Sequence, residues 1–102
     1  MSGLGGSSVA LAVALLGNRC LCLLKLGRYE EGRRDAQEAV ELDPSYVKGF
    51  YRLALCQKEC SDLAGAWESA DRALQLAPED VEARRLARKI SALEHGYPEE
   101  DE

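Results

Sequence analysis

The sequence contains few of the residues on which catalysis and metal binding usually depend. Its 102 residues include a single histidine, His95, which lies near the C-terminal end. We find no pairing of a nucleophile with a base, no set of four metal ligands and no glycine-rich phosphate-binding motif. These absences argue against an enzyme, and they predict a protein that needs no metal and no cofactor.

Positive charge is also in short supply. Lysine and arginine total 13 against 18 acidic residues, which gives a net charge of −5 at pH 7. Much of the excess acid lies in the final residues 98–102, so the rest of the chain is nearly neutral. Proteins that bind nucleic acid concentrate positive charge on one face, and we therefore expect no nucleic-acid partner.

A long hydrophobic run is missing as well. Residues 9–16 are apolar, but a membrane-spanning helix needs about 20 such residues. No basic segment precedes this run, and no small-residue cleavage site follows it before Asn18, so it does not match a signal peptide. We expect neither secretion nor a membrane partner.

The cysteines are spaced for packing rather than for a metal site or a disulfide framework. Cys20 and Cys22 are two positions apart, and Cys56 and Cys60 are four apart, all within predicted helices. Residues two apart on a helix point about 200° from each other around the axis, so Cys20 and Cys22 cannot ligate one ion. The expected role is that of small buried thiols, and reduced cysteines imply a cytoplasmic location.

What the sequence does contain is an internal repeat. A shift of 34 residues superimposes the chain on itself and aligns residues of similar size. The aligned pairs include Leu16 with Phe50, Cys20 with Ala54, Tyr29 with Leu63, Ala36 with Ala70, Ala39 with Ala73, Leu42 with Leu76 and Pro44 with Pro78. This pattern resembles the tetratricopeptide repeat, which implies an all-α solenoid of helix-turn-helix units.

Local signals place the ends of the helices. Gly27 suits the left-handed turn that follows a helix, Pro44 interrupts the chain, and Asp62 can cap the helix after it. We expect helices over 9–26, 29–42, 46–60, 63–76 and 81–93, which form repeats 13–46 and 47–80 and a C-terminal capping helix. The domain would span 9–94, with disorder at 1–8 and in the acidic tail 95–102.

Within this family, the sequence resembles the carboxylate-clamp domains of heat-shock co-chaperones. The matching positions are Asn18, beside Arg19, and the pair Lys48 and Arg52 one helical turn apart. The resemblance implies that Asn18, Lys48 and Arg52 bind the carboxylate at the acidic C-terminal end of a chaperone of the seventy- or ninety-kilodalton class. Arginine can donate two parallel hydrogen bonds to a carboxylate, lysine adds a compact charge, and the amide of asparagine can orient the peptide end.

Helical spacing adds groove-lining candidates to this site. Leu21 and Lys25 follow Asn18 along one face of the first helix, and Leu55 follows Lys48 and Arg52 along the third. The family clamp has two further members, a lysine and an asparagine from a preceding repeat, and this chain shows no counterpart of them. We therefore expect weak binding by this chain alone.

A structural role is the open alternative. Two repeats are fewer than the roughly three that such folds usually need. Ala10, Leu11 and Ala14 would face the place where a preceding repeat stands, so they could drive self-association into a homo-oligomer. In that case the protein would be a scaffold or assembly module.

Overall fold

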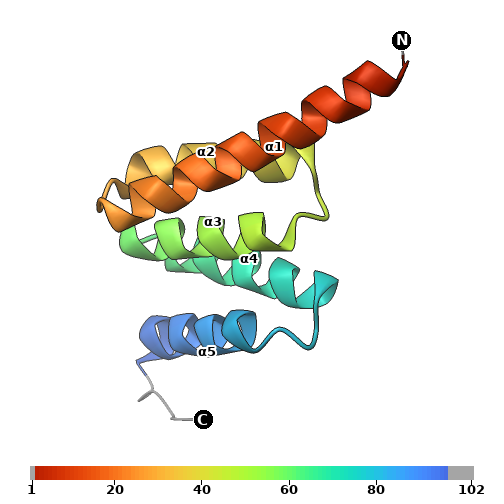
Figure 1. Ribbon diagram of the computed structural model, residues 1–102. Helices are drawn as coiled ribbons and strands as arrows, with labels where there is room; N and C mark the ends of the chain where they lie inside the picture. Colours follow the sequence, from red (N-terminus) through yellow and green to blue (C-terminus); the bar gives the residue numbers. More distant parts are fainter. Residues whose placement is uncertain (1, 97–102) are drawn as a thin grey trace.

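The computed structural model describes residues 2–96 and the side chains of residues 8–96. Its helices are α1 (Ser2–Lys25), α2 (Tyr29–Leu42), α3 (Val47–Glu59), α4 (Leu63–Leu76) and α5 (Val81–His95). No strand occurs among the described residues, and Figure 1 shows the helices following one another down the molecule. The expected all-α fold class is confirmed.

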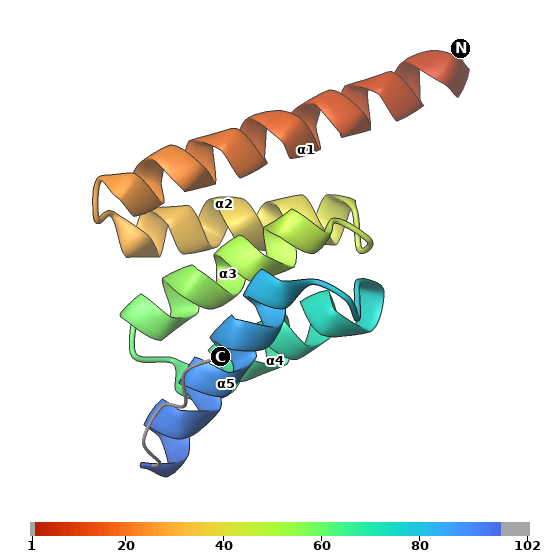
Figure 2. The same ribbon diagram turned by 60° about the horizontal axis from the view of Figure 1, so that its bottom comes forward.

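The helices pack as two antiparallel pairs and a closing helix. α1 packs on α2, α3 on α4, and α2 and α4 each contact the next helix along the chain. α3 also contacts both α1 and α5. Figure 1 shows α1 and α3 in front of α2 and α4, and Figure 2 shows α5 in front of α4. Side chains from α1, α3 and α5 can therefore meet on a common face.

Small side chains allow the helices of each pair to approach closely. Two hydrophobic clusters form the core: one of Cys20, Ala36, Val40, Leu53 and Cys56, and a second of Ala54, Ala66, Ala70, Leu86 and Ile90. Alanines at the helix crossings are almost fully buried, as the shared repeat pattern predicts. Leu86 and Ile90 come from α5, so this helix covers the open side of the second pair.

The two helical hairpins use the same turn with different residues. Gly27 adopts φ of 75°, and Ser61, the equivalent residue of the second repeat, adopts φ of 66°. Each turn is closed by a backbone hydrogen bond, from Arg28 N to Leu23 O and from Asp62 N to Gln57 O, both 2.8 Å long. Left-handed backbone is unfavourable for a residue with a Cβ, so Ser61 holds a local strain that Gly27 avoids.

We predict that Ser61→Gly raises the free energy of unfolding by about 0.5–1 kcal/mol, because relief of the left-handed strain outweighs the added freedom of glycine in the unfolded chain. Gly27→Ser is expected to lower it by a similar amount. A Cβ at Gly27 would meet no atom within 4 Å, so that variant reports on the backbone alone. Urea denaturation measures both changes, and a less stable Ser61→Gly protein would contradict the prediction.

The ends of the domain differ from the sequence prediction. Residues 2–8 were expected to be disordered, but α1 already includes Ser2. Extending an existing helix costs much less than starting one, and no proline interrupts this segment. At the other end α5 includes His95, and Gly96 closes it in a left-handed conformation, so the expected tail from residue 95 begins too early. Met1 at the N-terminus and residues 97–102 of the expected tail lie outside the described residues.

The cysteine prediction is correct in part. Cys20 and Cys56 are fully buried with their sulfur atoms 3.9 Å apart, whereas Cys60 is partly exposed and Cys22 is exposed. Contact with Cys20 and burial raise the pKa of the Cys56 thiol, which favours the neutral form. Cys22 departs from the prediction because α1 has one face in contact with α2, and two positions along a helix lead to the opposite side.

Helix α1 is more apolar than residues 9–16 alone suggest. By length and composition, Ser8–Lys25 is able to cross a membrane, and 22% of this segment is buried within the fold. Several of its side chains nevertheless pack in the protein, among them Val13, Cys20 and Leu23. Arg19 in the same segment forms an ion pair with the mostly buried carboxylate of Asp35, at 2.7 Å. A mostly buried core helix of a water-soluble protein and a signal sequence near an N-terminus both pass the same test, so the absence of secretion and of a membrane partner stays a prediction.

Candidate functional site

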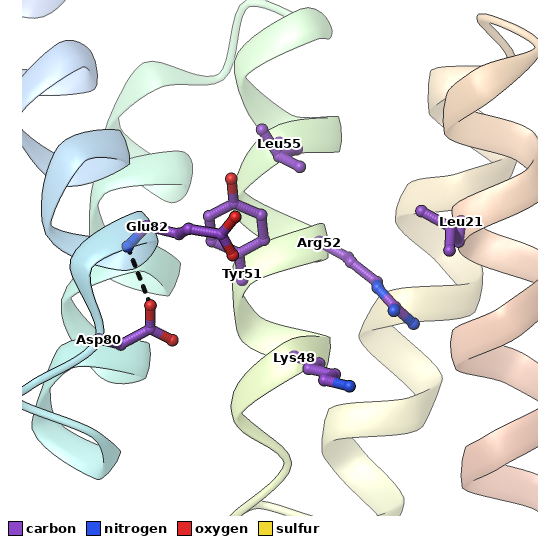
Figure 3. A pocket seen from close by; sticks show the side chains of 7 residues that line it. All are labelled: Leu21, Lys48, Tyr51, Arg52, Leu55, Asp80 and Glu82. Carbon is purple, nitrogen blue, oxygen red and sulfur yellow. Dashed lines mark hydrogen bonds between the residues drawn. The ribbon is translucent and has the colours of Figure 1, made fainter.

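A pocket of about 250 Å³ lies on the face shared by α1, α3 and α5. It is lined by Leu21 of α1, by Lys48, Tyr51, Arg52 and Leu55 of α3, and by Asp80 and Glu82 at the start of α5 (Figure 3). The residues from α3 are spaced three or four apart, which brings them to one side of that helix. α3 therefore forms the floor of the pocket, and the other helices form its sides.

Lys48 and Arg52 supply positive charge to this pocket. Figure 3 shows both side chains pointing from α3 toward the side of the pocket where Leu21 of α1 lies. Lys48 is exposed and makes no hydrogen bond or ion pair with any residue that the structure describes. Arg52 has no ion pair within the same residues, so its charge too is uncompensated. Two such cations one helical turn apart attract an anion.

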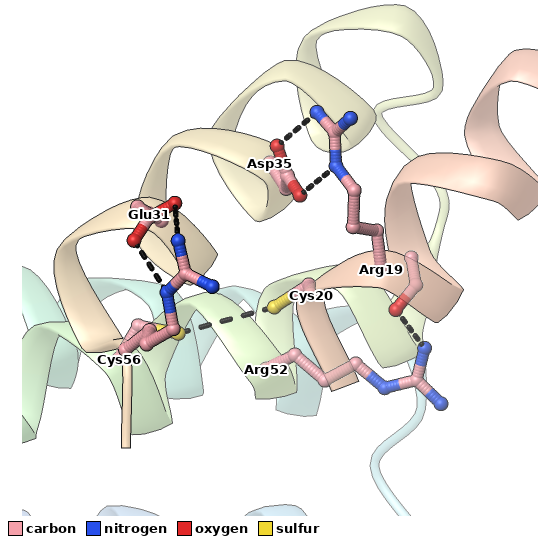
Figure 4. Close-up of polar contacts among 8 residues, drawn as sticks. Arg19, Cys20, Glu31, Asp35, Arg52 and Cys56 are labelled. Carbon is pink, nitrogen blue, oxygen red and sulfur yellow. Dashed lines mark hydrogen bonds and ion pairs between the residues drawn. The ribbon is translucent and has the colours of Figure 1, made fainter. Parts of the chain in front are cut away.

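Arg52 is held in position by the first repeat. Its Nη1 donates a hydrogen bond of 2.8 Å to the carbonyl oxygen of Gly17, which is the dashed line that begins at Arg52 in Figure 4. The same nitrogen lies 3.3 Å from the hydroxyl of Tyr46. These contacts use one nitrogen of a guanidinium that carries five N–H groups. The edge formed by Nε and Nη2 makes no hydrogen bond within the described residues, and it can grip a carboxylate with two parallel bonds.

The position of Arg52 depends on the absence of a side chain at Gly17. This residue is buried within α1, and a Cβ placed on it would overlap the hydroxyl of Tyr46 and lie 3.0 Å from its Cζ. Glycine inside a helix costs about 1 kcal/mol relative to alanine. In return for this cost, the missing side chain at position 17 leaves room for Tyr46 and Arg52 to approach the α1 backbone closely.

Gly17→Ala is expected to destabilise the fold by about 1–3 kcal/mol, although alanine favours helices, because the new methyl group displaces the Tyr46 ring. Chemical denaturation measures the loss. Adding Tyr46→Phe should recover part of it, since that change removes the overlapping hydroxyl. A Gly17→Ala protein as stable as the wild type would show that Tyr46 moves aside freely.

The structure brings together most of the predicted site. Lys48, Arg52, Leu21 and Leu55 all line the pocket, whereas Asn18 and Lys25 are exposed on α1 and are not among its lining residues. Asn18 lies three positions before Leu21, so the two share a face of the helix. Asn18 is therefore placed beside the pocket rather than in it, and its contact with a ligand stays a prediction.

Three lining residues, Tyr51, Asp80 and Glu82, were not predicted from the sequence. Tyr51 lies three positions after Lys48, and this helical spacing was sufficient to predict that it shares a face of α3 with Lys48. Asp80 and Glu82 gave no such signal, because acids at the start of a helix are expected as caps. Asp80 does cap α5: its Oδ1 accepts hydrogen bonds from the backbone N–H groups of Glu82 and Ala83, at 3.0 and 3.2 Å.

These acids affect the electrostatics of the pocket. Burial raises the pKa of the Tyr51 hydroxyl, and the negative charges of Glu82 and Asp80 raise it further. In Figure 3, Glu82 extends from α5 across Tyr51, on the opposite side of α3 from Arg52. The pocket thus has a positive side toward α1 and a negative side toward α5.

Antiparallel helix pairs stacked one after another, with a charged pocket on one face, define a helical solenoid. Residues 13–46 match the model of the tetratricopeptide repeat family. Together with the five-helix arrangement of the described residues, this match shows that the chain belongs to the tetratricopeptide-repeat family.

Several curated proteins resemble the chain over most of its length. Sperm-associated antigen 1 of Rattus norvegicus is 38% identical over 74 residues, which is 72% of this chain and 8% of that protein. DnaJ homolog subfamily C member 7 of Homo sapiens is 35% identical over 77 residues, or 76% of this chain and 16% of the relative. Hsp70-Hsp90 organizing protein 3 of Arabidopsis thaliana is 35% identical over 89 residues, which is 81% of this chain and 16% of that protein. The chain thus spans a small part of these relatives.

Solved structures agree with the fold. The first tetratricopeptide domain of Spaghetti (RPAP3), bound to the HSP90 peptide SRMEEVD, has a TM-score of 0.79 at 29% identity and covers 81% of this chain and 66% of that one. The second such domain of human RPAP3, in complex with the HSP70 peptide SGPTIEEVD, has a TM-score of 0.75 at 32% identity, with 78% and 66% covered. Both neighbours therefore hold acidic chaperone peptides.

Proposed function

We propose that this domain is an adaptor that binds the acidic C-terminal peptide of a heat-shock chaperone of the seventy- or ninety-kilodalton class. The observation that carries the proposal is the pair of cations, Lys48 and Arg52, side by side in one pocket, neither of which forms an ion pair within the described residues. The peptides held by the two RPAP3 domains end in Glu-Glu-Val-Asp, which supports a ligand of this chemistry.

The proposed binding relies on charge-assisted hydrogen bonds. The terminal aspartate of such a peptide carries two carboxylates, one for the free edge of the Arg52 guanidinium and one for Lys48. The amide of Asn18, on the neighbouring face of α1, would donate to the peptide end. Each bond of this kind contributes about 1.5–3 kcal/mol. With these few contacts we expect a dissociation constant between roughly 1 μM and 1 mM.

The proposal includes a non-catalytic role in the cytoplasm. Tethering a peptide requires complementary charge and shape, and it needs no cofactor. The paired thiols of Cys20 and Cys56 would remain reduced in that compartment.

Calorimetric titration of the 102-residue chain with a peptide ending in Glu-Glu-Val-Asp, beside its C-terminally amidated twin, tests this function. We expect saturable binding of the free acid, at least tenfold weaker binding of the amide, and loss of affinity as salt is added. Equal affinity for the two peptides, or no binding at millimolar concentration by the folded protein, would contradict the proposal.

We infer self-association as a second candidate function, because the first half of α1 exposes apolar side chains. Val9, Leu11 and Leu15 are 42%, 60% and 60% exposed, and Figure 1 shows this part of α1 projecting beyond α2. Sedimentation equilibrium at tens to hundreds of micromolar tests the idea, with Leu11→Glu and Leu15→Glu as disrupting changes. A monomer throughout that range would rule out a homo-oligomer of functional strength.

A further inference from the structure

We propose that the pocket is bipolar and prefers C-terminal peptides that carry a positively charged side chain shortly before the terminal carboxylate. This inference rests on the proposed function, because it assumes that Lys48 and Arg52 anchor the carboxylate. It concerns the opposite side of the pocket, where Asp80 and Glu82 lie.

The positive and negative sides are separated by the width of α3. Lys48 and Arg52 point toward α1, while Asp80 and Glu82 come from the start of α5 on the other side (Figure 3). Tyr51 and Leu55 lie on α3 and give the pocket an apolar floor. A peptide anchored at Arg52 that follows the pocket must therefore carry its preceding residues toward the acids.

No basic side chain pairs with the two acids within the described residues. Neither forms an ion pair with any residue that the structure describes, and both raise the pKa of Tyr51. The N-terminus of α5 offsets them in part, but a helix end amounts to roughly half a unit charge against two full charges. Arg84, the nearest basic residue in the sequence, donates to the carbonyl oxygen of Pro78 at 2.8 Å and does not line the pocket.

The negative charges of Asp80 and Glu82 would repel a strongly acidic peptide on this side of the pocket. A glutamate shortly before the terminal residue approaches Asp80 and Glu82, whereas a lysine there forms ion pairs with them. The domain would consequently differ in preference from the RPAP3 domains, whose peptides carry two glutamates before Val-Asp.

The test compares two free-acid peptides, one ending in Glu-Glu-Val-Asp and one ending in Lys-Lys-Val-Asp. Calorimetry on the 102-residue chain should give about fivefold tighter binding of the lysine peptide, since each exposed ion pair changes affinity by roughly two- to fivefold. Added salt should reduce this preference.

Variants separate the proposed contacts from the overall negative charge of the protein. Asp80→Asn with Glu82→Gln should remove most of the preference, and asparagine retains the ability to cap α5. Glu79→Gln removes a charge from an exposed residue in the same loop that does not line the pocket, and it should leave the preference unchanged.

Each outcome decides one point. If neither peptide binds, the proposed function fails, and this inference fails with it. If both bind but the glutamate peptide binds more tightly, or if the preference is the same in the double variant as in the wild type, the bipolar pocket is wrong while the carboxylate site stands.

Discussion

Replacing Arg52 with alanine is expected to weaken binding of a free-acid chaperone peptide by about 10- to 150-fold. The guanidinium is the donor best placed to grip a carboxylate, because Gly17 and Tyr46 hold it with its other edge available. Loss of charge-assisted hydrogen bonds worth about 1.5–3 kcal/mol gives a change of this size. Calorimetric titration of the wild type and the variant measures it.

Two further variants make this test specific. Arg52→Gln keeps a polar N–H donor but is shorter than arginine and carries no charge, so it should lose nearly as much affinity as Arg52→Ala. Lys89→Ala removes a charge from an exposed residue of α5 that does not line the pocket, and it should bind normally. Equal losses at Lys89 and Arg52 would indicate a diffuse charge effect rather than a site.

Ile90→Ala is expected to lower the free energy of unfolding by about 2–5 kcal/mol, the usual cost of truncating a fully buried side chain. Ile90 has no exposed surface and packs in the cluster that joins α5 to the second helix pair. A domain of this size has little stability to spare, so the variant should unfold at a much lower denaturant concentration.

Leu93→Ala in the same helix provides the matched control. Leu93 is 50% exposed, and its truncation should cost less than about 1 kcal/mol. Equal destabilisation at the two positions would mean that α5 does not pack as the structure shows.

The architecture was predictable because its signals are local and repeated. A period of 34 residues, the left-handed turn at Gly27 and the break at Pro44 placed all the helices to within a few residues, apart from the start of α1. Lys48, Arg52 and Leu55 were predictable as one face of α3, since helical spacing alone brings them together.

The remaining features of the site depend on contacts between elements, which helical spacing does not reveal. The need for glycine at position 17 arises from Tyr46, which follows α2 in the sequence and packs against the backbone of α1. Asp80 and Glu82 line the pocket because α5 packs beside α3. Their place at the start of a helix predicts only a capping role. Asn18 shares a face of α1 with Leu21 but does not line the pocket, so its contact with a ligand stays a prediction.

A carboxylate site on this face is tested by a two-dimensional NMR map of the 15N-labelled chain during titration with a free-acid peptide ending in Glu-Glu-Val-Asp. We predict that the largest shift changes fall on α1 and α3 around Leu21, Lys48 and Arg52, and that the amidated peptide leaves these signals nearly unchanged. Changes centred on α2 and α4, or identical maps for the two peptides, would contradict a carboxylate site on this face.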